Sequence, residues 1–141
     1  MIRFRKEHHE SLLPSRERYS KYAKALLSSS GDNAYHSRPV GMTIEIIPER
    51  SPYLLKQGDS LTFRVLFRGQ PARGLQVEST WAGSGGSKKT IAGRTDPEGR
   101  IVIPLQSAGK WRIHTILMER SSDTSVVDWE SYWASLTFEV R

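Results

Sequence analysis

The chain of 141 residues contains no cysteine. This absence excludes disulfide bonds, zinc sites built on thiolates and cysteine nucleophiles. Histidine is scarce, since only four occur, at His8, His9, His36 and His114. A metal site in this chain would therefore have to be built from few imidazoles and from carboxylates.

Long apolar runs are also missing. No segment approaches the roughly 20 residues that a membrane-spanning helix needs. Residues 1–6 are basic, but the polar run Glu7-His8-His9-Glu10 follows them, where a signal peptide would have an apolar core. We expect the chain either to be cytoplasmic or to be a fragment whose export signal lies upstream.

The formal net charge is +6 at neutral pH, which raises the question of nucleic-acid binding. Lysine and arginine are spread along the chain, with a mild cluster within residues 3–24, and no DNA- or RNA-binding motif accompanies them. We therefore expect no nucleic-acid partner. The same basic surface suits anionic lipid or polysaccharide.

The composition changes near residue 40, and we expect residues 1–39 to be a basic N-terminal extension. Apolar side chains within 19–27 fall at helical spacing, and Ser15 is suited to cap that helix. The segment also fits a strand, with Tyr22, Lys24 and Leu26 on one face. We favour a short helix, joined by a hinge at 28–33 to a domain that folds without it.

Residues 40–141 carry the alternation of β-strands. The clearest case is 60–68, where Leu61, Phe63 and Val65 point one way. Further strands are expected at 43–48, 75–81, 88–95, 100–105, 111–117 and 132–140. The turn 96–99 (DPEG) is typical of type I, and we expect it to pair the strands on either side. About seven short strands without helices predict an all-β, antiparallel Ig-like or prealbumin-like β-sandwich.

Several motifs give the chain a family resemblance. They are 16–27 (RERYSKYAKALL), 39–48 (PVGMTIEIIP), 52–53, 66–74 (LFRGQPARG), 94–100 (RTDPEGR), 109–112 (GKWR) and the Trp-rich closing segment 128–139 (DWESYWASLTFE). In this order they resemble a bacterial periplasmic family of unknown function associated with nickel or cobalt uptake, often labelled NikM-like. The resemblance implies a location in the periplasm or cell envelope.

Two departures from that family change what can be carried over. Its members usually begin with an exported leader and an N-terminal β domain with a histidine near the mature start, and neither is seen here. We expect this chain to correspond to the C-terminal part of such a protein, with residues 1–39 as a remnant of the missing upstream domain. A metal site in that domain cannot be transferred to this chain.

Nickel is the metal that the resemblance suggests, and His8 and His9 are the candidate ligands. Adjacent histidines in a polar tail bind nickel weakly, and a selective site needs more converging ligands. His114 alternates with Trp111, Ile113 and Thr115, so we expect it on the exposed face of a strand. We expect no other cofactor.

Other candidate sites have weaker support. The segment 83–90 (GSGGSKKT) lacks the spacing of a phosphate-binding loop and fits a hairpin. Asp128 and Glu130 fit structural anchors better than catalytic carboxylates. Trp129 and Trp133 could stack on a sugar, but we favour the end of the core for both.

No catalytic constellation is visible, so we expect no enzyme. The leading hypothesis is a non-enzymatic cell-envelope module that is associated through its family with nickel or cobalt uptake and acts by binding or scaffolding. The alternative is a generic surface or adhesion module that binds a protein or glycan of the envelope.

Overall fold

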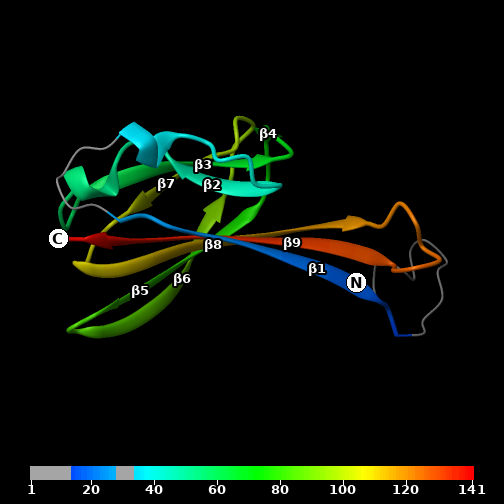
Figure 1. Ribbon diagram of the computed structural model, residues 1–141. Helices are drawn as coiled ribbons and strands as arrows, with labels where there is room; N and C mark the ends of the chain where they lie inside the picture. The colour runs from blue at the N-terminus through cyan, green and yellow to red at the C-terminus, as the bar shows by residue number, and fades with distance from the viewer. Residues whose placement is uncertain (1–13, 28–33) are drawn as a thin grey trace.

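Two β-sheets pack face to face in the computed structural model, which describes residues 14–27 and 34–141 (Figure 1). The five-stranded sheet has the order β1-β9-β8-β5-β6, and the second sheet places β2, β4 and β7 beside β3. The described residues contain no α-helix, only two short 3-10 helices. The predicted β-sandwich is confirmed, while its Ig-like or prealbumin-like type stays a prediction.

The bounds of the elements follow. The five-stranded sheet consists of β1 (Glu17–Ala25), β5 (Gln76–Gly83), β6 (Gly86–Arg94), β8 (Gly109–Arg120) and β9 (Trp129–Val140). The second sheet consists of β2 (Ile44–Pro48), β3 (Ser60–Phe67), β4 (Gln70–Pro71) and β7 (Arg100–Pro104). The 3-10 helices are η1 (Ala34–Ser37) and η2 (Pro52–Leu54). None of the described helices is long and apolar enough to cross a membrane.

Alternating apolar side chains from both sheets form the core, as the sequence predicts. Along β9, Leu136 is fully buried and Phe138 is 2% exposed. Across the sandwich, Phe63 of β3 meets Phe138, with the ring centroids 5.8 Å apart. Burial of each such side chain contributes about 1.5–3 kcal/mol, so β9 is a principal source of stability.

The expected helix near residues 19–27 is wrong, because this segment forms strand β1. Its backbone pairs in parallel with β9, with Lys24 opposite Leu136, so the sandwich is not wholly antiparallel. Tyr22 packs against the core and Leu26 is part of it, which is the alternation that the strand alternative required. A helix with so small an apolar face has little stability of its own, whereas the edge of β9 offers unpaired backbone groups.

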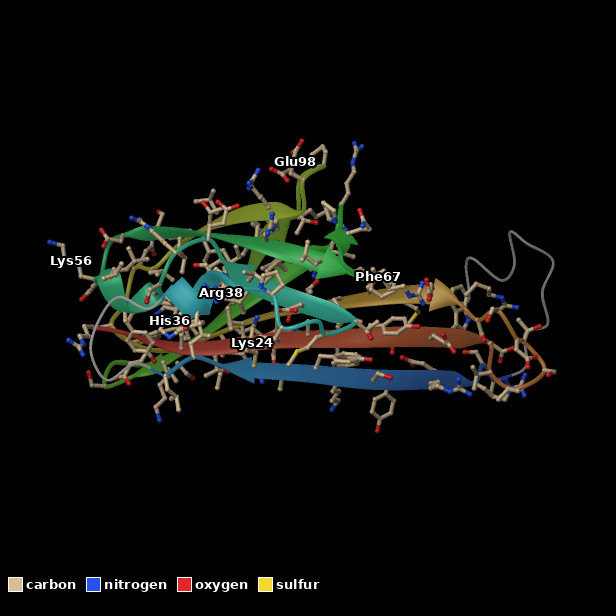
Figure 2. All side chains as sticks on the ribbon, turned by 45° about the horizontal axis from the view of Figure 1, so that its top comes forward. Lys24, His36, Arg38, Lys56, Phe67 and Glu98 are labelled. Atoms are coloured by element: carbon tan, nitrogen blue, oxygen red, sulfur yellow. The ribbon has the colours of Figure 1, made fainter. Side chains whose placement is uncertain are left out.

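A buried ion pair ties β1 to the second sheet. The Nζ of Lys24 donates to the Glu45 carboxylate of β2 at 2.8 Å, and the two side chains are 12% and 2% exposed. The same carboxylate accepts backbone N–H groups from Val40, Gly41 and Met42. Figure 2 shows Lys24 between β1 and the segment that carries His36 and Arg38.

The boundary expected near residue 40 stays a prediction as a domain boundary. In the structure, residues before this boundary take part in the sandwich. β1 forms one edge of the five-stranded sheet, and the described part of the expected extension is therefore not structurally separate.

The turn at 96–99 is present, but it joins different strands from those expected. The Gly99 N–H donates to the Asp96 carbonyl at 2.9 Å, and Asp96 Oδ1 accepts from the N–H groups of Glu98 and Arg100. However, β7 pairs with β3, not with β6. The expected hairpin is therefore wrong, because the turn carries the chain from one sheet to the other, where the inward residues of β7 complete the core of the second sheet.

Candidate binding surface on the five-stranded sheet

The five-stranded sheet has one face in the core and one face toward solvent, which we call the outer face. On β8, Ile113 and Thr115 are buried, so the side chain of His114 between them lies on the outer face. The pairing places Ser135 of β9 and Glu78 of β5 beside His114. The predicted orientation of His114, away from the apolar set, is confirmed, although its side chain is only 21% exposed.

Large apolar side chains are exposed on the outer face. Tyr19 of β1 is 63% exposed, Ile116 and Met118 of β8 are 37% and 45%, and Ile91 of β6 is 63%. The register places Tyr19 and Met118 on either side of Ser131 in β9. Exposed apolar residues that cluster on one face are typical of interaction surfaces.

Trp133 lies on this face, so the expectation that it closes the end of the core is wrong. Its indole N–H donates to the Ser131 hydroxyl at 3.1 Å, and that hydroxyl in turn donates to the Glu17 carboxylate. Ser131 is 1% exposed. The indole is therefore held in one orientation by partly buried hydrogen bonds while it remains partly open to solvent.

Two adjoining hollows, about 390 and 340 Å³ in volume, lie beside this indole. Both are lined by Lys89, His114 and Trp133, and we call the pair the outer-face hollow. Lys21 of β1 and Lys89 of β6 both line the smaller one, although these strands are at opposite edges of the sheet. Long side chains from both edges thus converge above the centre of the sheet.

The outer-face hollow is predominantly cationic. Lys89 Nζ lies 3.0 Å and His114 Nδ1 3.5 Å from the Glu78 carboxylate, while Lys21 Nζ lies 5.4 Å from the Trp133 ring centroid. The hydrogen bond from Lys89 lowers the pKa of Glu78 below its usual value. Burial lowers the pKa of His114, and this outweighs the opposing effect of Glu78. At neutral pH, the outer-face hollow is therefore lined by three cations (Lys21, Lys89 and Arg112), one carboxylate and a neutral imidazole.

Of the other histidines, the structure describes His36, which does not line this site. His8 and His9 lie outside the described residues. His36 is buried: its Nε2 donates to the Leu27 carbonyl at 3.1 Å, and its Nδ1 lies 2.8 Å from the Ser51 hydroxyl oxygen. Within 14–27 and 34–141, no group of three or more His, Asp or Glu side chains is arranged to hold a metal ion.

The carboxylates of the closing segment have structural partners. Asp128 accepts the backbone N–H of Arg16 at 2.8 Å, and Glu130 accepts from the Arg18 guanidinium at 3.2 Å and from the Tyr132 hydroxyl at 3.0 Å. Both residues thus anchor neighbouring segments, as the anchor interpretation requires.

Two other parts of the chain were singled out in the sequence, Trp129 and residues 83–90. Trp129 is 8% exposed, so it is buried as expected, with the Arg120 guanidinium 5.2 Å from its ring centroid, although it lies outside the main core cluster. Residues 83–90 form a tight hairpin, with Gly83 opposite Gly86, as expected. A further hollow of about 270 Å³ opens between β6 and β7, lined in part by Trp81 and Trp111.

Trp133 was considered from the sequence as a residue that could stack on a sugar, but its cationic neighbours in the outer-face hollow were not. The alternation that places Ala134 in the core already places Trp133 on the opposite face, so that signal was present. By contrast, Lys21 and Lys89 enter the site only through the pairing of β1 with β9 and of β6 with β5. Local patterns do not fix which strands are neighbours.

Comparison with known proteins gives one match. Residues 3–119 match the sequence model of a family described as "Domain of unknown function (DUF4198)". No curated protein and no solved structure matches the chain. Because the match covers most of the chain, including the strands from β1 through nearly all of β8, the protein belongs to the DUF4198 family.

Proposed function

We propose that this protein is a non-enzymatic binding module of the bacterial cell envelope and that it binds through the outer face of its five-stranded sheet. The observation that carries the proposal is the half-buried indole of Trp133, held by Ser131 beside a cationic hollow. An aromatic ring oriented by hydrogen bonds provides contact area with little loss of conformational entropy on binding.

A role in binding, not catalysis, accords with how the titratable groups are used. Glu45 is paired with Lys24, Asp128 holds Arg16, and His36 is bonded through both ring nitrogens. A nucleophile or general base needs a partner positioned to activate it. Among the described residues, these groups instead stabilise the fold.

The envelope location and the association with nickel or cobalt uptake are part of this proposal. They are supported by the motif order that resembles the NikM-like family, while the DUF4198 match supports a domain of unknown function. We propose that the chain scaffolds or binds a component of such a system and does not itself hold nickel tightly. Fractionation of cells that express the gene from its own locus tests the location: recovery in the cytosol would contradict it.

Nickel binding is tested by calorimetry on the tag-free protein. We expect an affinity no better than about tens of micromolar, as two adjacent imidazoles supply few ligands, and we expect replacement of His8 and His9 by alanine to remove most of it. A submicromolar one-to-one isotherm that survives both replacements would overturn this part of the proposal.

The binding surface is tested by co-sedimentation with isolated bacterial envelope fragments. We expect the protein to sediment with the fragments and Trp133→Ala to remain in solution. The matched control is Val102→Ala, which removes an apolar side chain that is 60% exposed on β7 of the other sheet. Equal sedimentation of the Trp133 and Val102 variants would contradict the proposed surface.

A protein partner is the second candidate. It is favoured by the exposed apolar side chains of Tyr19, Ile91 and Met118, since apolar patches of this kind are typical of protein interfaces. Protease treatment of the envelope fragments separates a protein partner from a partner that is not a protein. It would abolish sedimentation only if the partner is a protein.

A further inference from the structure

We propose that the outer-face hollow binds an acidic saccharide, with a sugar ring against the indole of Trp133 and a carboxylate among Lys21, Lys89 and Arg112. This inference rests on the proposed function, because it takes the outer face as the binding surface. It goes further by naming the chemical class of the ligand.

The aromatic part of the site is built before any ligand arrives. Trp133 donates to Ser131, and Ser131 donates to Glu17, so a chain of hydrogen bonds that crosses from β9 to β1 fixes the indole. The imidazole ring of His114 lies beside the indole of Trp133, with the two ring centroids 5.9 Å apart. An apolar ring face flanked by polar groups suits a pyranose, whose own faces are apolar and whose rim is polar.

The charge around the indole selects an anion. The cationic side chains come from three different strands: Lys21 from β1, Arg112 from β8 and Lys89 from β6. Glu78 is the acidic side chain that lines the hollow, and its carboxylate already lies 3.0 Å from Lys89 Nζ and 3.5 Å from His114 Nδ1. A ligand carboxylate would therefore enter an excess of positive charge, and the chain's net charge of +6 favours its approach at long range.

The two features together distinguish this ligand from simpler ones. A free carboxylate or phosphate ion would use the cations but would make no use of the indole or of hollows of about 390 and 340 Å³. A neutral saccharide would use the indole but would gain nothing from three cations. An acidic saccharide uses both, because its carboxylate is attached to the ring that stacks.

Calorimetric titration of the intact protein is the test. The probes are trisaccharides of galacturonate and of mannuronate, a neutral galactan trisaccharide and citrate. We expect at least one acidic trisaccharide to bind about tenfold or more tightly than both the neutral trisaccharide and citrate. Its affinity should fall as salt is added, since the cations are partly exposed. No binding of either acidic trisaccharide, or equal binding of the neutral one, would overturn the inference.

Variants locate the binding. We expect Trp133→Ala to abolish binding of the acidic trisaccharide and Arg112→Gln to weaken it about tenfold through loss of a charged hydrogen-bond donor. The matched control is Arg73→Gln, which removes an exposed guanidinium outside the hollow and should leave the affinity unchanged. Thermal melts show that each variant is folded. Binding that is insensitive to Trp133→Ala would also overturn the inference.

Failure here is distinguishable from failure of the proposed function. If neither acidic trisaccharide binds but sedimentation with envelope fragments still depends on Trp133, the acidic-saccharide inference falls and the binding surface stands. If the sedimentation is abolished by protease and is not reduced by excess acidic trisaccharide, the partner is a protein and the inference is again wrong.

Discussion

Replacement of Lys24 by methionine tests whether β1 belongs to the sandwich. The change keeps the length of the side chain and removes the cation that meets Glu45 at 2.8 Å. Because the Glu45 side chain is only 2% exposed, its carboxylate would lose a partner that water cannot replace. Breaking a buried ion pair costs about 3–5 kcal/mol. Glu45 keeps three backbone N–H donors in the variant. We therefore expect Lys24→Met to lower the free energy of unfolding by about 2–3 kcal/mol, which is at or slightly below the lower end of that range.

Thermal denaturation followed by circular dichroism measures this loss. In a chain of this size, 1 kcal/mol shifts the Tm by roughly 3–4 °C, so Lys24→Met should melt about 6–12 °C below the unaltered protein. Lys56→Met removes an exposed lysine, labelled in Figure 2, and should change the stability by no more than about 0.5 kcal/mol. Equal melting temperatures for the Lys24 and Lys56 variants would refute the reasoning.

The pH dependence gives the same test a second readout. Burial opposes ionisation of Glu45, but the hydrogen bonds from Lys24 and the loop backbone outweigh it, and the net effect is a lowered pKa. A carboxylate whose pKa is lower in the folded state stabilises the protein above its unfolded pKa of about 4.3, and this contribution is lost as pH falls through the folded value. In Lys24→Met, where burial remains and the cation is gone, the folded pKa of Glu45 rises toward its unfolded value, so the stability should depend less on pH in this acidic range.

Three further predictions concern the core, a turn and the outer face. Leu136→Ala removes a fully buried side chain of β9 and should destabilise the protein by about 2–5 kcal/mol in urea unfolding, whereas a loss below 1 kcal/mol would show that β9 is not central to the core. Gly99→Ala places a Cβ 2.6 Å from the Val65 carbonyl oxygen at a φ of +76°, and should cost about 1–3 kcal/mol in the same assay; a neutral effect would contradict this turn geometry. Because burial lowers the pKa of His114, stability should fall as pH drops from about 6.5 toward its folded value, and His114→Gln should reduce that dependence between about pH 7 and 5; an unchanged profile would contradict the burial of this imidazole.

Alternation within single strands predicted much of this fold. The residues of β3 and β9 that were expected in the core are there, because a strand with one apolar face has only one way to bury it. The same rule identifies Trp133 as an outward residue once Ala134 and Leu136 are placed inside. We had expected Trp133 in the core because tryptophan is usually buried, and this expectation outweighed the alternation.

Pairing between distant segments could not be predicted in the same way. The pattern of residues 19–27 fits both a helix and a strand, and the choice depends on the free edge of β9, more than 100 residues away in sequence. The burial of Glu45 depends on the loop that supplies its N–H donors and on Lys24. The cationic hollow likewise exists only because Lys21 and Lys89 are brought together from the two edges of the sheet.

Hydroxyl-radical footprinting with envelope fragments tests the central claim, that the outer face is the binding surface. The account predicts that bound fragments protect Tyr19, Met118 and Trp133 from oxidation, since all three side chains lie on that face. Tyr35 of η1, which is 69% exposed, should be oxidised to the same extent with and without fragments. Protection of Tyr35 without any change at Trp133 would contradict the account.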